Sequence, residues 1–201
     1  SSEFSISRGL LRVKELVDAA VKYKMPAIAL TDLNNFFGLV KFITYAESKG
    51  VKPILGCILN VKDSFSDTPH EVLCLAKTNM GLRGLIKLIS ISQNQIQSHK
   101  NFITLEQLEE FKKDIFIILG GSNSYLYELN QQNRTQDSEN YLKKYMSVAK
   151  GNLLLEINNF QDQNFALAKK TIFSLASKLK IPVIGTNDCM FLNKEDFDIH
   201  E

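Results

Sequence analysis

The chain has little cysteine, and its three cysteines are far apart. Cys57, Cys74 and Cys189 form no CxxC pair or other zinc-binding spacing. An odd number of widely spaced thiols argues against a disulfide scaffold and suits a reducing compartment. We therefore interpret all three as small buried hydrophobic side chains.

Long apolar runs are also missing. No stretch approaches the ~18 apolar residues that a membrane-spanning helix needs, and the start, Ser1–Phe4, lacks the pattern of a signal peptide. We therefore expect a soluble, cytoplasmic protein. With 201 residues, 44% of them hydrophobic, the chain is long enough to bury a core, and we expect one domain over residues 1–201.

Neither sign of charge dominates. The 24 basic and 22 acidic residues are well mixed and give a net charge of +2, so no basic stripe predicts strong autonomous DNA binding. No glycine-rich phosphate-binding fingerprint follows a predicted strand, which disfavours a dinucleotide-binding fold. The three histidines have no serine or cysteine nucleophile in a matching loop context, so no hydrolase triad is predicted.

The chain does show alternating helix and strand patterns. Apolar residues recur at helical spacing in several segments, and short apolar runs between them are typical of buried strands. We predict helices over residues 9–24, 39–48, 81–97, 104–111, 137–150 and 163–179. We predict strands over residues 27–30, 53–61, 72–76, 115–119, 153–157 and 183–185. Such alternation favours an α/β protein with a parallel sheet.

Two predicted strands end in a carboxylate. The run Ala27–Leu30 leads into Thr31-Asp32, and Val183–Gly185 leads into Asp188. Ligand chemistry in α/β folds sits at the carboxyl ends of parallel strands, so these two carboxylates could face one site. Asn35 and Asn187 flank them, and we interpret both as loop-stabilising side chains.

Four short motifs resemble those of a known family and lie in that family's order. They are Lys52-Pro-Ile-Leu-Gly56, Leu75-Ala-Lys-Thr-Asn79, Gly185-Thr-Asn-Asp188 and Asp198-Ile-His-Glu201. Together they resemble the PHP (polymerase and histidinol phosphatase) domain at the N-terminus of bacterial DNA polymerase III alpha subunits. This resemblance implies a distorted (β/α)7 barrel of PHP type, here lacking its first strand, which would precede Ser1.

Active members of that family resemble hydrolases that hold several metal ions on His, Asp and Glu side chains. The resemblance places other residues at most of those ligand positions, and four of them are apolar and cannot bind a hard cation. The apolar residues at ligand positions are Leu33, Ile58, Phe160 and Met190. Ser1 stands at a further ligand position, and the neighbouring His70 is one residue out of register with the ligand position at Glu71.

Three carboxylates, Asp32, Glu71 and Asp188, therefore remain as a residual pocket at the family's metal position, with Asn35 and Asn187 beside it. We expect no catalytic residue, no bound metal and no other cofactor in this chain. A structural role is the simpler interpretation of Asp32, since a loop carboxylate can accept backbone N–H groups.

The resemblance thus implies a scaffold and interaction domain within a much longer polymerase subunit. That parent would carry out template-directed DNA synthesis with magnesium at a polymerase site elsewhere in its chain. The implied partners are the proofreading exonuclease subunit and the rest of the alpha subunit, with DNA reached through the parent. The alternative is an active metal-dependent phosphoesterase, acting as an exonuclease, pyrophosphatase or phosphatase.

Overall fold

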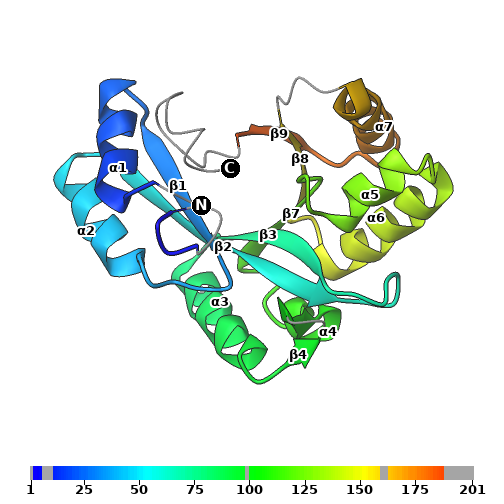
Figure 1. Ribbon diagram of the computed structural model, residues 1–201, viewed down its shortest axis with the longest axis horizontal. Helices are drawn as coiled ribbons and strands as arrows, with labels where there is room; N and C mark the ends of the chain where they lie inside the picture. The colour runs from blue at the N-terminus through cyan, green and yellow to red at the C-terminus, as the bar shows by residue number, and fades with distance from the viewer. Residues whose placement is uncertain (1, 6–10, 98–99, 159–162, 188–201) are drawn as a thin grey trace. The chain divides into compact units, whose positions relative to one another are not determined.

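The computed structural model describes residues 2–5, 11–97, 100–158 and 163–187 (Figure 1). It divides the chain into two compact units, Ser1–Ile58 with Asp188–Glu201, and Leu59–Asn187. The motif Asp198–Glu201, together with Asp188, Phe160 and Met190, lies outside the described residues.

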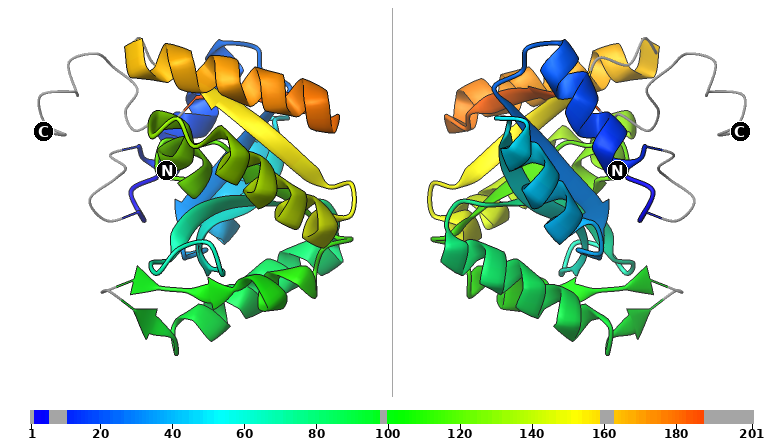
Figure 2. Two further views of the ribbon diagram at one scale, coloured as in Figure 1. Left: turned by 90° about the vertical axis from the view of Figure 1, so that its right-hand side faces the viewer. Right: turned by 90° about the vertical axis from the view of Figure 1, so that its left-hand side faces the viewer.

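The first unit is a βαβ arrangement preceded by a helix. Helix α1 (Val13–Lys22) leads to β1 (Ala27–Leu33), α2 (Leu39–Ser48) and the first half of β2 (Lys52–Lys62). β1 and β2 pair in parallel, from Ala27 opposite Lys52 to Leu33 opposite Ile58. The two helices lie side by side against these strands in the right-hand view of Figure 2.

Apolar spacing explains the core of this unit. Val13, Val17 and Ala20 recur every three or four residues along α1, and all three are fully buried. Val13 and Val17 pack with Leu30 and Phe42. Val21 follows Ala20 in the last turn of α1 and is exposed.

The second unit is built on the strands β3 (His70–Ala76), β7 (Ile115–Leu119), β8 (Leu153–Asn158) and β9 (Val183–Thr186), in that order in the sheet. β7, β8 and β9 run parallel, as predicted. β3 pairs antiparallel with β7, so the prediction of an all-parallel sheet is wrong here. Two helices and three two-residue strands lie between β3 and β7 in the chain. The rule of right-handed crossovers concerns parallel strands, so it does not apply to this pair.

Smaller elements complete the second unit. Helix α3 (Asn79–Ser92) is followed by the two-residue strands β4 (Ile96–Gln97) and β5 (Lys100–Asn101), which pair with each other. β6 (Ile103–Thr104) pairs in parallel with the end of β2, and Thr104 and Gln107 form a capping box at the start of α4 (Leu105–Glu109). α5 (Tyr125–Gln131), α6 (Thr135–Ala149) and α7 (Gln163–Leu179) follow.

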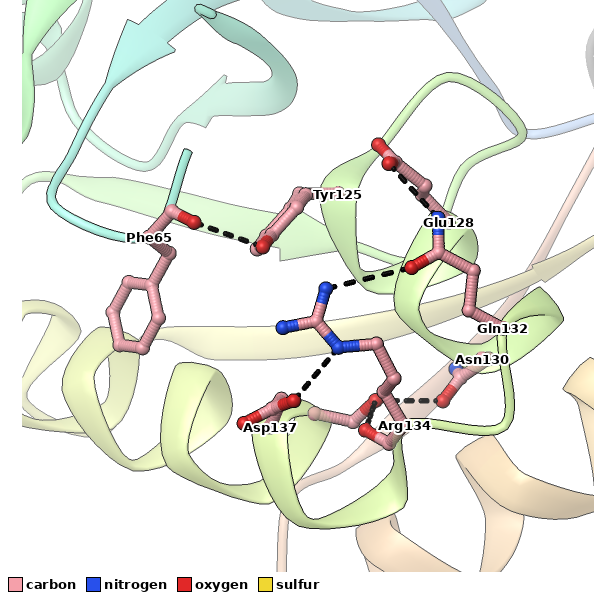
Figure 3. Close-up of polar contacts among 8 residues, drawn as sticks. Phe65, Tyr125, Glu128, Asn130, Gln132, Arg134 and Asp137 are labelled. Atoms are coloured by element: carbon pink, nitrogen blue, oxygen red, sulfur yellow. Dashed lines mark hydrogen bonds and ion pairs between the residues drawn. The ribbon is translucent and has the colours of Figure 1, made fainter. Parts of the chain in front are cut away.

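The segment between α5 and α6 is more ordered than its polar sequence indicates. Asn130 lies inside α5, is 2% exposed, and its Oδ1 accepts a hydrogen bond of 2.9 Å from the Ser138 hydroxyl. Arg134 Nε donates to Asp137 Oδ2 at 2.8 Å, and its Nη1 donates to Gln132 Oε1 at 3.4 Å (Figure 3). The polar residues between α5 and α6 thus form a tight, hydrogen-bonded turn.

The cysteine interpretation is confirmed where the structure describes it. Cys57 and Cys74 are fully buried in strands, and Cys189 lies outside the described residues. No helix among the described residues is long and apolar enough to cross a membrane.

Candidate functional site

Asp32 lies at the carboxyl end of β1 and is 2% exposed. Its carboxylate accepts three short hydrogen bonds from the segment that precedes α1. The Ser2 backbone N–H and the Ser5 hydroxyl donate to Oδ1 at 2.6 and 2.7 Å, and the Ser2 hydroxyl donates to Oδ2 at 2.7 Å. A buried carboxylate is tolerated when its lone pairs are satisfied in this way.

Asn35 extends this network. Its Nδ2 donates to the carbonyl oxygens of Phe4 and Leu33 at 3.0 and 2.9 Å, and its Oδ1 accepts from the Phe37 N–H at 3.1 Å. Asn35 is 8% exposed. The interpretation of Asn35 as a loop-stabilising residue therefore agrees with its contacts. We call Ser2, Ser5, Asp32 and Asn35 the serine clasp.

The partners of Asp32 that the structure describes are all uncharged. In the part of the chain that the structure describes, no lysine, arginine or histidine nitrogen pairs with Asp32. The donors are uncharged, so the negative charge is stabilised by aligned N–H and O–H dipoles. This arrangement positions the preceding segment and leaves the Asp32 oxygens with few lone pairs for another ligand.

Beside the clasp, two apolar side chains stand at positions where the resemblance implies metal ligands. Leu33 and Ile58 are paired opposite each other at the ends of β1 and β2. Hard cations require oxygen donors, and zinc requires nitrogen, sulfur or oxygen. Among the described residues, no group of three or more His, Cys, Asp and Glu side chains is placed to hold a metal ion. The donor set described here does not fit the multinuclear site of the family.

The other residues of the expected pocket belong to the second unit or lie outside the described chain. Glu71 is half-buried on β3, and Asn187 is exposed just after β9. Asp188 is not among the described residues.

His70 is a core residue rather than a ligand. It is 8% exposed, and its ring stacks on Tyr125 with centroids 4.4 Å apart. The Tyr125 hydroxyl donates to the Phe65 carbonyl at 2.8 Å (Figure 3). Tyr145, in the same aromatic cluster, donates to Asp63 at 3.1 Å, and burial raises its pKa well above the ordinary value. The cluster anchors the loop between β2 and β3.

Sequence reasoning missed the serines of the clasp and a second buried carboxylate. Glu156 on β8 is 8% exposed, and the Thr186 hydroxyl on β9 donates to its Oε2 at 2.9 Å. Gly120 has a φ of 115° and packs against the Glu156 backbone, where a Cβ would meet its carbonyl oxygen at 2.6 Å. The sequence does offer a signal for Glu156, because a charged residue within an otherwise apolar strand is unusual. No comparable pattern marks Ser2 or Ser5 as partners of a buried carboxylate.

The sequence is similar to bacterial polymerase subunits over its whole length. It is 30% identical over 203 residues to a DNA polymerase III subunit alpha from Buchnera aphidicola, covering 100% of this chain and 18% of that protein. It is 30% identical over 204 residues to the DNA polymerase III subunit alpha from Pasteurella multocida, and this alignment covers 100% of this chain and 17% of that protein. The chain thus spans less than a fifth of the length of these relatives.

Solved structures share the fold at low sequence identity. A protein from Bifidobacterium adolescentis assigned as a metal-dependent phosphoesterase superposes with a TM-score of 0.62 and 10% identity, over 92% of this chain and 84% of its own. An amidohydrolase from Chromobacterium violaceum superposes with a TM-score of 0.58 and 11% identity. This superposition covers 90% of this chain and 83% of the amidohydrolase. These likenesses confirm the expected α/β fold and carry no further information about activity.

A family model decides the assignment. The model described as the PHP domain matches residues 1–160 of this 201-residue sequence. The resemblance that the short motifs indicated is therefore confirmed, and the chain belongs to the PHP domain family.

Proposed function

We propose that this chain is a non-catalytic PHP domain of a DNA polymerase III alpha subunit and that it serves as a scaffold for protein contacts. Alignment of the entire chain with polymerase III alpha subunits supports the placement. The parent protein would synthesise DNA on a template, in the cytoplasm, with magnesium at a polymerase site outside these residues. Residues 1–201 would act as one domain.

The observation that carries the non-catalytic role is the engagement of Asp32. Its carboxylate accepts from Ser2 and Ser5, and the adjacent Leu33 and Ile58 offer no donor atoms. A hydrolytic metal centre needs several ligands that converge on one ion and leave a position for water. The alternative, an active phosphoesterase, has the support of fold likeness alone.

We propose the proofreading exonuclease subunit and the remainder of the alpha subunit as partners, with DNA bound by other parts of the parent. A domain that has lost its chemistry and keeps its fold retains surfaces on which other proteins can dock. The near-neutral net charge agrees with protein contacts rather than autonomous DNA binding.

Two measurements on the purified chain test this function. Elemental analysis of protein prepared without chelator should give no stoichiometric zinc, manganese or iron. Assays with a chromogenic phosphate ester and single-stranded DNA, with manganese added, should show no turnover above the buffer. Bound metal together with hydrolysis that Asp32→Asn abolishes would overturn the scaffold function and support the phosphoesterase.

A further inference from the structure

Lysines precede β7, β8 and β9, the strands that run parallel in the sheet of the second unit. Lys113 stands two residues before β7, Lys150 three residues before β8 and Lys180 three residues before β9, and each is exposed. Because these strands pair in parallel, their amino ends meet at one edge of the sheet. Neighbouring strands lie about 4.8 Å apart. The pairing therefore brings together lysines that are far apart in the sequence.

Two further lysines lie at the same edge. Lys77 follows β3, whose end pairs with the start of β7, and its N–H donates to the Asp114 carbonyl at 2.8 Å. Lys112 lies in the turn before β7. The buried Asn152, at the start of β8, joins both, because its Oδ1 accepts from Lys77 Nζ at 3.1 Å and its Nδ2 donates to the Lys112 carbonyl at 2.8 Å. We call Lys77, Lys112, Lys113, Lys150 and Lys180 the lysine row.

The carboxylates beside the lysine row have partners of their own. Lys112 Nζ lies 2.8 Å from Glu109 Oε1. This hydrogen bond holds the pKa of Glu109 below its ordinary value of 4.5, and the charges of Lys144 and Lys150 lower it further. The Asp114 carboxylate accepts a hydrogen bond of 2.7 Å from a neighbouring threonine hydroxyl. The lysines of the row that form no ion pair among the described residues are Lys77, Lys113, Lys150 and Lys180. The row therefore keeps an excess of positive charge.

The lysine row offers charge without apolar anchors. In residues 110–114, 150–152 and 180–182, all within the part that the structure describes, no large hydrophobic side chain is exposed. Met80 is the exposed hydrophobic residue nearest to Lys77 in the sequence. Protein partners are usually held by large side chains at the centre of a contact, and single-stranded nucleic acid by aromatic rings that stack on its bases. Ammonium groups alone match phosphate oxygens, which are bound through charge and counterion release.

We propose that the lysine row contacts the phosphate backbone of DNA without reading its sequence. This inference rests on the proposed function, which places the chain in a parent that synthesises DNA, and it adds a contact made by this domain itself. The contact supplements the DNA binding that we assign to other parts of the parent. The net charge of +2 conceals the row, because acidic residues elsewhere in the chain cancel it.

Fluorescence anisotropy of a short labelled DNA duplex, titrated with the purified chain at several salt concentrations, tests the proposal. If the row neutralises about three phosphates, the logarithm of the affinity should fall with the logarithm of the salt concentration with a slope of about −3. Lys113→Glu with Lys150→Glu and Lys180→Glu should weaken binding about 10-fold or more at low salt and flatten this slope. Glutamine at the same three positions should have a smaller effect in the same direction. Circular dichroism and thermal melting check that each variant is folded.

Two controls separate the row from charge in general and from an acidic protein partner. Lys14→Glu with Lys87→Glu and Lys170→Glu makes the same change of net charge at exposed helical positions outside the row. This variant should bind the duplex within about three-fold of the unaltered chain at moderate salt. Polyglutamate of the same total charge should displace the duplex about 10-fold less effectively than unlabelled duplex does, because its charges are spaced farther apart than those of DNA.

The outcomes separate this inference from the proposed function. Loss of duplex binding in the row variants and not in the control variant supports the row. Equal loss in both sets, or no duplex binding by the folded chain at low salt, overturns the inference and leaves the proposed function standing. Polyglutamate that displaces the duplex as well as DNA does would assign the row to an acidic protein and overturn it too. Bound metal with hydrolysis would instead overturn the proposed function, whatever the duplex does.

Discussion

The Ser5 hydroxyl donates to Asp32 Oδ1 at 2.7 Å and at the same time accepts the Leu33 N–H at 3.1 Å. One side chain therefore satisfies both the carboxylate and the backbone at the end of β1. Such a paired arrangement restrains the position of each partner more than a single hydrogen bond would. It makes Asp32 a structural residue whose loss is measurable as stability.

Asp32→Ala is expected to lower the free energy of unfolding by roughly 2–3 kcal/mol, because Ser2 and Ser5 would be left as buried donors without an acceptor. Urea unfolding of the variant and the unaltered chain measures the difference. Glu47→Ala, at an exposed position of α2, is the control and should change stability by less than about 0.5 kcal/mol. Equal effects at the two positions would show that the clasp contributes nothing.

Gly81→Ala should destabilise the second unit, although alanine favours a helix by about 1 kcal/mol over glycine. A Cβ on Gly81 would overlap the Asp114 carbonyl oxygen and approach Ile115. We expect a net loss of roughly 1–3 kcal/mol from this overlap. Thermal melting measures it, with Ser90→Ala at an exposed position of the same helix as the control. A variant that melts higher than the unaltered chain would show that α3 can shift without cost.

The stability that Glu139 contributes should depend on pH. Lys143 and Lys178 lie 2.8 and 2.6 Å from its two oxygens, and hydrogen bonds from them hold its pKa below the ordinary value of 4.5. A carboxyl group whose pKa is lowered by folding stabilises the protein above its unfolded pKa, and this stability is lost as the pH falls through the folded pKa.

Glu139→Gln should therefore lower the urea midpoint near neutral pH, and the difference from the unaltered chain should disappear once the solution is acidic enough to protonate Glu139 in the folded chain. Glu106→Gln, at an exposed position of α4, provides the matched control and should leave the midpoint almost unchanged. A difference that widens as the solution becomes more acidic would contradict the assignment of these ion pairs.

Cys74 should resist alkylation in the native protein. Burial in β3 raises the pKa of its thiol to about 12, and the thiolate is the reactive form. Treatment with iodoacetamide near pH 8, followed by peptide mass spectrometry, should find Cys74 unmodified until urea unfolds the chain. Rapid native labelling at this position would mean that β3 opens readily.

The sequence predicted most helices and strands of this fold because their apolar residues follow the spacing of each element. α2, β7 and α7 begin and end at the predicted residues. The antiparallel pairing of β3 with β7 was not predicted, because strand direction depends on distant partners rather than on local pattern. The order in the turn around Arg134 could not be predicted, because polar residues in a sequence give no sign of whether they hydrogen-bond to one another.

The candidate site was only partly predictable. The strand-end position of Asp32 followed from the apolar run before it, and the interpretation of Asn35 agrees with the contacts of that residue. The hydrogen-bond partners of Asp32 could not be predicted from the sequence, because Ser2 lies 30 positions away from Asp32 in the chain. Hydroxyl side chains occur widely in proteins, and their sequence gives no sign of which distant carboxylate they will meet.

The pairing of Leu33 with Ile58 has a consequence for how this domain can change over generations. A lone histidine at position 33 or a lone glutamate at position 58 would introduce a polar group where apolar neighbours and an already occupied Asp32 offer little to bind it. In the scaffold domain that we propose, each single step toward a metal centre would therefore weaken the fold before an ion could be held. Selection on such a domain would act on its surface and its stability rather than on hydrolysis.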